Sequence, residues 1–331
     1  MHRFLLLSTL ATLAFAQDGP YKILKTAKVG GAGGFDYVYA DSAGRRLYIP
    51  RTGDGARVTV FNLDTLASAG EIANTNARGA AVDPKSSHGF ASSKPVAMWD
   101  SKTMAPIKTI DVEGGPDGIM FDPFNNRVWI FSHRAPNATV INAADGSIAG
   151  TVDLGGAPEQ AASDGKGHLY VDIEDKDKIA VVDAKTLTVT TQYDLAGKGG
   201  GCAGLAMDVK NHILFATCRE PQNMVVLNAE DGKIITTLPI GRGTDGAVFN
   251  PKTMEAFSSQ GDGTLTIVKE DSPTSFAVEQ TLQTKVSAKT LTLDAKTGHI
   301  LLIAADFGPT PAGQRRGPML PDSFSILEVG K

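Results

Sequence analysis

Catalytic motifs, cysteines and aromatic residues are all scarce in this sequence, and each scarcity narrows the possible functions. Signatures such as G-x-S-x-G, or a glycine-rich phosphate loop between a strand and a helix, do not occur. The two cysteines, Cys202 and Cys218, form neither a C-x-x-C redox pair nor a C-x-x-C-H haem attachment site. Aromatic residues make up 7% of the chain, whereas there are 36 glycines, a composition typical of a sheet protein with many tight turns.

Long apolar runs are also absent, except at the N-terminus. Residues 1–16 combine Arg3 with an apolar run and an A-x-A motif, the pattern of a secretory signal peptide that is cut between Ala16 and Gln17. The run is too short to be kept as a membrane span, and we expect no span elsewhere. The sequence therefore predicts a soluble, monomeric protein that is periplasmic or secreted.

Positive charge does not exceed negative charge. The chain has 32 lysines and arginines against 36 aspartates and glutamates, a formal net charge of −4, and loss of Arg3 with the signal peptide makes the charge one unit more negative. This balance disfavours non-specific binding to nucleic acid, because that binding depends on neutralising phosphates. The adjacent Arg315 and Arg316 form too small a basic cluster to change this expectation.

A repeat of about 40 residues accounts for nearly all of the remaining sequence. Its clearest copy, residues 202–241, has four short β-branched or apolar runs separated by turn-forming residues, which predicts four antiparallel strands. An acidic or amide residue, here called the anchor, ends the first run of each copy: Asp41, Asp83, Asp122, Asp164, Asp208, Asn250 and Asp294. Four strands per period is the signature of propeller blades, so the sequence predicts an all-β, seven-bladed β-propeller.

The predicted blades follow one another as a single domain over residues 17–331. They cover residues 35–75, 77–114, 116–156, 158–198, 202–241, 244–285 and 288–329. The last copy ends after its third strand, and residues 21–29 form an unassigned strand similar to the outer strands of other copies. We predict that this N-terminal strand completes the last blade and closes the ring. A Pro/Gly-rich loop, residues 307–322, interrupts this blade and is expected to be a lid or a partner-binding loop.

The repeat resembles one that is already known. Its best copies, GHLYVDIEDKDKIAVVDAKTLTV and NHILFATCREPQNMVVLNAEDGKIITTLPIG, are similar to the YVTN-type repeat of the YncE-like secreted β-propellers. The similarity extends over residues 21–331 and implies an extracytoplasmic seven-bladed ring. It implies no single activity, because propellers host many functions.

The two cysteines lie at equal distances from the turn predicted around residue 210, so they face each other across adjacent antiparallel strands. In an oxidising compartment this placement predicts a disulfide between Cys202 and Cys218. A buried pair of free thiols is the alternative that the sequence leaves open.

Ionisable residues occupy six of the seven positions that lie five residues before the anchors, where the innermost strand of each blade begins, and alanine occupies the seventh. Equivalent positions around one axis place these side chains at the mouth of the central channel: Asp36, Arg78, Asp117, Glu159, Ala203, Asp245 and Lys289. Loops after the second strands share this face and add charged groups: Arg51, His133, Arg134, Glu174, Asp175, Arg219, Glu220 and Asp306. Four further histidines fall on the opposite face, spaced around the ring, and cannot converge on one metal: His88, His168, His212 and His299.

The charged mouth permits two interpretations. Its charges can neutralise one another as ion pairs that order the blades. Alternatively, the mouth, including His133, binds a small ligand or a protein partner. Its bases would hold an anionic group, and its acids would hold hydroxyls, amines or a cation such as Ca²⁺. The bases are Arg78, Lys289, Arg51 and Arg219, and the acids are Asp36, Asp117, Glu159 and Asp245. No metal-ligand spacing motif occurs, and no other cofactor is predicted.

An enzymatic alternative uses the same residues. By analogy with other seven-bladed rings, a lactonase-like or lyase-like enzyme would use Glu159 or Asp117 as general base, His133 as acid and Arg78 to stabilise an oxyanion. Carboxylates that crowd together acquire the raised pKa that such a base needs. The sequence contains no residue set specific to one reaction, so it leaves the choice between a binding protein and an enzyme open.

Overall fold

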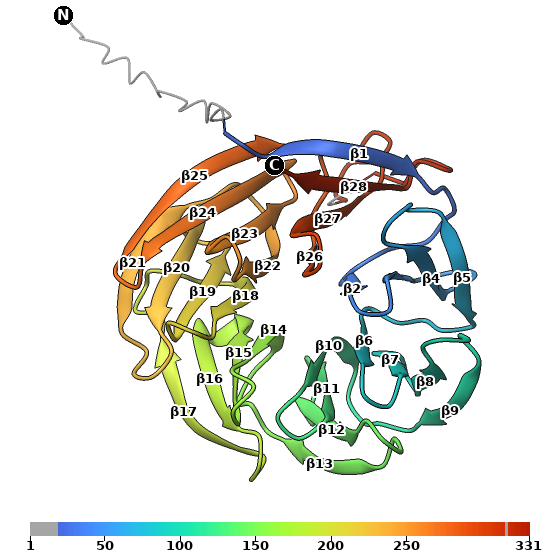
Figure 1. The fold of residues 1–331 in the computed structure, drawn as a ribbon, viewed down its shortest axis with the longest axis horizontal. Helices are drawn as coiled ribbons and strands as arrows, with labels where there is room; N and C mark the ends of the chain where they lie inside the picture. The colour runs from blue at the N-terminus through green and yellow to red at the C-terminus, as the bar shows by residue number, and fades with distance from the viewer. Residues whose placement is uncertain (1–18, 315–316) are drawn as a thin grey trace, which may run out of the picture.

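The computed structural model describes residues 19–314 and 317–331, which form seven four-stranded antiparallel sheets around a central axis (Figure 1). The predicted signal peptide, residues 1–16, lies outside the described residues. The all-β, seven-bladed prediction is confirmed. One short 3₁₀ helix, η1 (Glu174–Lys176), lies in the loop after the second strand of the fourth blade.

Blades follow one another around the ring in chain order, and each blade runs from an inner strand to an outer one. Blade 1 contains β2 (Tyr39–Asp41), β3 (Arg46–Arg51), β4 (Arg57–Asn62) and β5 (Ser68–Ala73). Blade 2 contains β6 (Ala80–Asp83), β7 (His88–Ala91), β8 (Val96–Asp100) and β9 (Pro106–Ile110). Blade 3 contains β10 (Pro116–Asp122), β11 (Arg127–Ser132), β12 (Ala138–Asn142) and β13 (Ile148–Val152).

The next three blades repeat this order. Blade 4 contains β14 (Pro158–Ser163), β15 (His168–Ile173), β16 (Lys178–Asp183) and β17 (Thr188–Asp194). Blade 5 contains β18 (Cys202–Asp208), β19 (Ile213–Cys218), β20 (Asn223–Asn228) and β21 (Ile234–Pro239). Blade 6 contains β22 (Thr244–Asn250), β23 (Glu255–Gln260), β24 (Thr264–Ser272) and β25 (Ser275–Gln283).

Blade 7 is assembled from both ends of the described chain. Its inner strands are β26 (Leu291–Asp294), β27 (His299–Ala304) and β28 (Ser325–Gly330), and β1 (Lys22–Lys28) forms its outer edge. β1 pairs antiparallel with β28, from Lys22 opposite Gly330 to Lys28 opposite Ser325. The predicted closing strand is therefore confirmed, and main-chain hydrogen bonds join the two ends of the ring.

The anchor residues have a common structural role, which explains why they recur. Each accepts a hydrogen bond from the backbone N–H two or three residues later and so stabilises the turn between the first and second strands of its blade. Asp83 Oδ1 accepts from Lys85 N at 2.9 Å, and Asn250 Oδ1 accepts from Lys252 N at 3.0 Å. Each copy of the repeat therefore has a turn-stabilising residue at the same position, as well as the same pattern of apolar residues.

The core consists of apolar layers between neighbouring blades, because strands buried on both faces need a partner sheet on each side. One layer joins Tyr48 of blade 1 to Trp99 of blade 2, both fully buried, with ring centroids 5.7 Å apart. Gly89 lies opposite Trp99 in the ladder, and a Cβ at this position would stand 2.2 Å from the indole. Only glycine leaves space for that tryptophan.

The loop between β27 and β28 contains the residues predicted as a lid. Phe307 and Met319 form an isolated bridge, and Gly308 N donates to Pro318 O at 2.8 Å, so the two arms of the loop run side by side. Residues 315 and 316 of this loop lie outside the described residues. Within residues 19–314 and 317–331, there is no helix with the length and apolarity to span a membrane.

Candidate functional site

The propeller brings charged side chains from all seven blades to one end of the central channel, here called the mouth. They come from the starts of innermost strands and from the loops after second strands, which share this end. Asp36 precedes the inner strand of blade 1, Asp117 is the second residue of the inner strand of blade 3, and Lys289 precedes the inner strand of blade 7. The predicted placement explains why residues far apart in sequence interact here.

The first half of the mouth is a chain of ion pairs between blades 1 and 4. Arg78 Nη1 lies 2.8 Å from Asp36 Oδ2, and Arg78 Nε lies 3.5 Å from Asp117 Oδ1. His133 Nε2 continues the chain, at 3.3 Å from Asp117 Oδ2 and 3.4 Å from Glu159 Oε1. Each contact therefore joins groups of opposite charge when His133 is protonated.

The second half runs from blade 4 to blade 7. Arg219 pairs with Glu174 and, at 3.0 Å, with Asp245, and Lys289 also pairs with Asp245. Lys289 in turn acts electrostatically on Asp36, which completes the circle. We call this closed set of groups the charge ring; it comprises Asp36, Arg78, Asp117, His133, Glu159, Glu174, Arg219, Asp245 and Lys289.

The sign of charge alternates around the charge ring except at one place. Glu159 and Glu174, both of blade 4, are neighbours in the ring, and one carboxyl oxygen of each lies within 4.8 Å of the other. The hydroxyl of Tyr37 reaches the same point from blade 1 and donates to Glu159 Oε2 at 2.7 Å. His133, Glu159 and Glu174 each present one metal-binding atom here, and these three atoms all lie within 4.8 Å of one another.

Burial and these contacts change the acidity of the groups in the ring. Burial raises the pKa of Asp36 to about 6, and the negative charge of Asp245 adds to the effect. Burial also raises the pKa of Asp117. For Glu159, burial alone would raise the pKa, but hydrogen bonds with His133 and Tyr37 outweigh it and lower the pKa to about 2. The hydrogen bond to Glu159 raises the pKa of His133 to about 9, so its imidazole is protonated at neutral pH.

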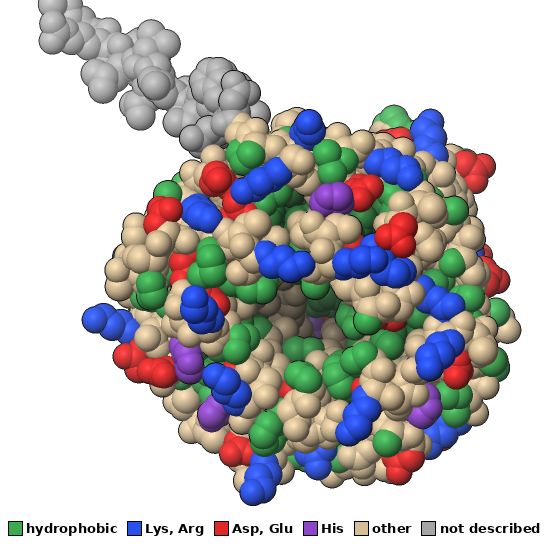
Figure 2. All heavy atoms as spheres, in the orientation of Figure 1, with side chains coloured by type: hydrophobic (Ala, Val, Ile, Leu, Met, Phe, Trp, Pro, Cys, Tyr) green, Lys and Arg blue, Asp and Glu red, His purple; other side chains and the backbone are tan. Residues whose placement is uncertain are grey.

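A cavity of about 240 Å³ continues from the mouth into the channel. Glu159 of the charge ring and its partner Tyr37 line it, and so do Gln160, Phe131 and Thr290. Figure 2 shows the channel end on, as a hollow at the centre of the molecule with apolar side chains around it. The cavity therefore offers charged groups at its opening and a mixture of apolar and amide groups below.

The cavity wall is held in shape by a side chain that bridges blades. Gln160 Oε1 accepts from Leu205 N at 3.1 Å and from Ala247 N at 2.9 Å, while its Nε2 donates to Ala247 O at 2.9 Å. One amide thus joins the inner strands of blades 4, 5 and 6. Because three bonds fix its orientation, Gln160 is a structural part of the channel lining.

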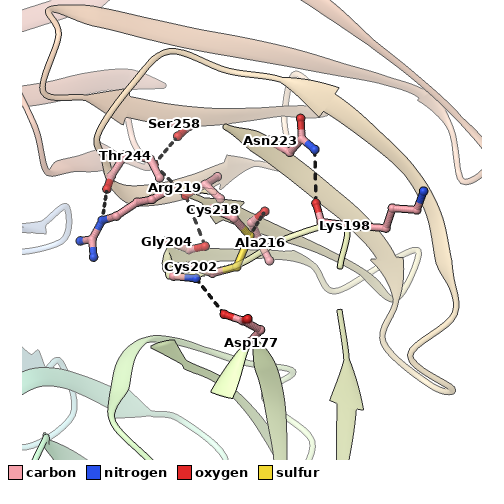
Figure 3. The surroundings of a disulfide bond; sticks show 12 residues. Asp177, Lys198, Cys202, Gly204, Ala216, Cys218, Arg219, Asn223, Thr244 and Ser258 are labelled. Atoms are coloured by element: carbon pink, nitrogen blue, oxygen red, sulfur yellow. Dashed lines mark hydrogen bonds between the residues drawn. A yellow bond between two sulfur atoms is a disulfide. The ribbon is translucent and has the colours of Figure 1, made fainter. Parts of the chain in front are cut away.

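The predicted disulfide is present and lies next to the charge ring (Figure 3). Cys202 and Cys218 join the ends of β18 and β19 that face the mouth, and Arg219 follows directly. Arg219 Nε also donates to Thr244 O at 3.3 Å, and Gly201 N donates to Asp177 Oδ1 at 3.0 Å. The disulfide therefore fixes the backbone from which Arg219 reaches Glu174 and Asp245.

Arg51, which the sequence suggested as an anion-binding residue, lies apart from the charge ring. Its side chain is 1% exposed, and its guanidinium stacks 3.4 Å from the centre of the Phe324 ring. Its Nη2 donates to Ala32 O at 3.0 Å and its Nη1 to Gly30 O at 3.4 Å. Arg51 thus ties the segment after the closing strand to blade 1.

Two residues that sequence reasoning did not select belong to the mouth. Tyr37 follows Asp36 and reaches across the channel to Glu159. Asp172, near the end of β15, is 0% exposed, and neither of its carboxyl oxygens has a hydrogen-bond partner within the described part of the chain. A buried charged residue type within an apolar strand, as in LYVDI, was the signal that could have selected Asp172.

The four histidines assigned to the opposite face lie at or just before the starts of second strands and contact separate groups. His168 Nδ1 is 2.9 Å from Asp164 Oδ2, and His299 Nδ1 is 2.7 Å from Glu328 Oε1. His212 lies 3.3 Å from Glu230, and His88 contacts the carbonyl of Ala143. The four histidines therefore have different partners and do not form one site.

Comparison with known proteins supports the fold and goes no further. No protein-family model matches the chain, and no curated protein matches it. Among solved structures, a chain in the crystal structure of a mitotic checkpoint complex is similar, with a TM-score of 0.76 and 10% sequence identity. The match covers 100% of this chain and 98% of that chain. At this identity the similarity concerns the seven-bladed architecture alone.

Proposed function

We propose that the protein is an extracytoplasmic, YncE-like propeller that binds a small polar molecule at its mouth. The observation that carries the proposal is the position of the charge ring at the opening of the cavity: Glu159 belongs to both, and Tyr37, which also lines the cavity, donates a hydrogen bond to it. Its location outside the cytoplasm is supported by the sequence pattern of residues 1–16 and by the disulfide.

The arrangement fits a ligand that carries both signs of charge, or an anionic group beside hydroxyls. Arg78 is 54% exposed and pairs with two carboxylates, so it can exchange one of them for an anionic group of a ligand. Asp36 and Asp117 then become free to accept hydrogen bonds from hydroxyl or ammonium groups. A cavity of about 240 Å³ favours a small molecule over a protein segment.

Native mass spectrometry of the purified protein tests this proposal. We expect a bound small molecule on the wild-type chain, and its loss when Arg78→Ala and Asp117→Ala are combined. The control combines Lys210→Ala with Asp271→Ala, which removes one positive and one negative charge from exposed positions on the opposite face. If the mouth variant retains every bound species and partner of the wild type, the mouth is not the binding site. A co-purifying protein that disappears with the mouth variant would replace the small molecule as ligand.

A second candidate, hydrolysis or elimination on a lactone-like substrate, is favoured by one observation. The imidazolium of His133 lies between Asp117 and Glu159, so a proton donor stands 3.3 Å from a carboxylate whose pKa burial raises. Asp117 would be the base, His133 the acid and Arg78 the group that stabilises an oxyanion. Glu159, whose pKa is lowered, is a weaker base than Asp117. The test is the turnover of a panel of lactones. If the wild type hydrolyses them no faster than the Glu159→Gln and Asp117→Asn variants do, this activity is excluded.

A further inference from the structure

The break in charge alternation is the feature of the mouth that ion pairing leaves unexplained. Around the rest of the charge ring every acid lies between basic groups, whereas Glu159 and Glu174 present carboxyl oxygens within 4.8 Å of each other. Two carboxylates at this distance repel unless a proton or a cation lies between them. Arg219 pairs with Glu174 from one side only, and its other partner is Asp245.

A third carboxyl group, that of Asp172, lies in the same blade and is fully buried, and burial raises its pKa. Leu169, Val171 and Ile173 pack between blades 3 and 4, so strand alternation turns Asp172 to the other side of β15, where Glu174 meets Arg219. The charged groups that act on Asp172 are Glu159 and Glu174. Asp172 is fully buried with both oxygens unpartnered. A buried carboxyl group without a partner is costly unless something else satisfies it.

We propose that the mouth binds one divalent transition-metal ion, of which Zn²⁺ is the best fit, through His133, Glu159 and Glu174. An imidazole nitrogen with two carboxylate oxygens is a typical zinc donor set, whereas Ca²⁺ prefers oxygen ligands alone. Asp172, whose buried oxygens have no hydrogen-bond partner among the described residues, can accept a hydrogen bond from a metal-bound water. Ca²⁺, the cation that the sequence suggested, is thus a poorer fit to the group that the fold assembles.

The geometry requires only side-chain adjustment. Ligands of tetrahedral zinc at about 2.1 Å from the ion lie about 3.4 Å from one another. The three candidate atoms already lie within 4.8 Å, so the widest pair closes by about 1.4 Å at most. Side-chain rotation of His133, which is 40% exposed, can supply much of this movement, because its loop is at the surface.

Three protein ligands leave one coordination position open. An open position distinguishes a site that takes a further ligand from a closed structural zinc site. Because the three ligands lie at the opening of the cavity, a carboxylate or other anionic oxygen of the small ligand can complete the coordination. This last step rests on the proposed function, whereas the metal site itself does not.

Isothermal titration of the chelator-treated, purified protein with ZnCl₂ tests the site. We expect one zinc ion per chain, at least about tenfold weaker binding for His133→Ala, and a similar loss for Glu174→Gln. The control is His168→Ala, since His168 also pairs with a carboxylate, at 2.9 Å, but on the opposite face. That variant should bind zinc as the wild type does. Glu174→Gln retains the shape of the side chain, so the test survives if His133→Ala fails to fold.

Several results would overturn the proposal. They are the absence of one-to-one zinc binding by the wild type, affinities of His133→Ala and Glu174→Gln equal to the wild type, or displacement of zinc by equimolar Ca²⁺. The titration contains no organic ligand, so it is independent of the binding function. Zinc binding without a small molecule in native mass spectra would refute the proposed function alone, and the reverse result would refute the metal site alone.

Discussion

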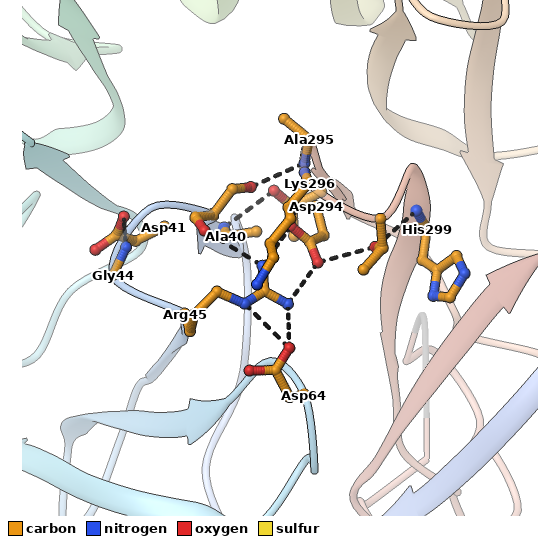
Figure 4. A network of polar contacts seen from close by, with 12 residues as sticks. Ala40, Asp41, Gly44, Arg45, Asp64, Asp294, Ala295, Lys296 and His299 are labelled. Atoms are coloured by element: carbon orange, nitrogen blue, oxygen red, sulfur yellow. Dashed lines mark hydrogen bonds and ion pairs between the residues drawn. The ribbon is translucent and has the colours of Figure 1, made fainter.

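Arg45 offers the most quantitative test of how the ring is held closed. It lies in the first turn of blade 1 and makes two hydrogen bonds of 2.8 Å to the carboxylate of Asp294 in blade 7 (Figure 4). It also pairs with Asp64 at 2.8 Å. The Asp294 side chain is 3% exposed and that of Arg45 is 16% exposed, so the Arg45–Asp294 pair is largely removed from solvent. We predict that Arg45→Gln destabilises the protein measurably.

The size of the effect follows from the acidity of Asp294. Burial opposes ionisation, but hydrogen bonds from Arg45 and Thr297 outweigh it and lower the pKa to about 2. The unfolded value is about 3.9, so ionised Asp294 contributes about 2.5 kcal/mol of stability above that pH. The contribution is lost as pH falls through the folded pKa, and about half of it remains at pH 3.

Urea denaturation at several pH values measures this contribution. At pH 7, Arg45→Gln should lower the free energy of unfolding by about 2 kcal/mol, because Thr297 still bonds to Asp294. The difference from wild type should shrink by roughly half at pH 3. Arg242→Gln, at an exposed position, is the matched control and should change little. A penalty that is equal at both pH values, or equal to that of the control, would refute the reasoning.

Further predictions concern the blade interfaces and the disulfide. Glu270 is 3% exposed, and burial raises its pKa to about 7, so the free energy of unfolding falls as pH rises from about 4.5 to about 7. In thermal melts, Glu270→Gln should therefore stabilise the protein by roughly 2–3 kcal/mol at pH 8 and by little at pH 5. The double variant Cys202→Ser, Cys218→Ser should lower the free energy of unfolding, measured in urea, by up to about 3 kcal/mol. A reducing agent should destabilise the wild type but leave this variant unchanged. Tyr21→Phe removes the hydroxyl bonded to Glu255 and should speed amide exchange in β1; unchanged exchange would contradict its clamping role.

The architecture could be predicted from sequence because it depends on local patterns that repeat. Turn anchors such as Asp83 and Asn250 satisfy nearby backbone groups, so their spacing is visible in one chain. Closure by β1 could be predicted from a missing strand at one end and a surplus strand at the other. The disulfide followed from hairpin geometry, since Cys202 and Cys218 are opposite each other in the ladder.

The details of the mouth could not be predicted in the same way, because they depend on side-chain reach across the channel. The repeat assigns a residue to a face of the propeller but does not say which neighbour it contacts. Tyr37 crosses to blade 4, whereas Arg51, at the end of β3, folds back onto Phe324 and the segment after β1. The approach of Glu174 to Glu159 likewise brings a loop to a strand of the same blade, and sequence spacing does not give the distance between their carboxyl groups.

The idea that the charge ring forms a binding site is tested most directly by a crystal structure of the protein grown with zinc, with anomalous data collected at the zinc edge. We predict a strong anomalous peak in the mouth, about 2 Å from a ring nitrogen of His133 and from one oxygen each of Glu159 and Glu174. A mouth without such a peak, with His133 still placed between Asp117 and Glu159 as an ion pair, would contradict the metal site.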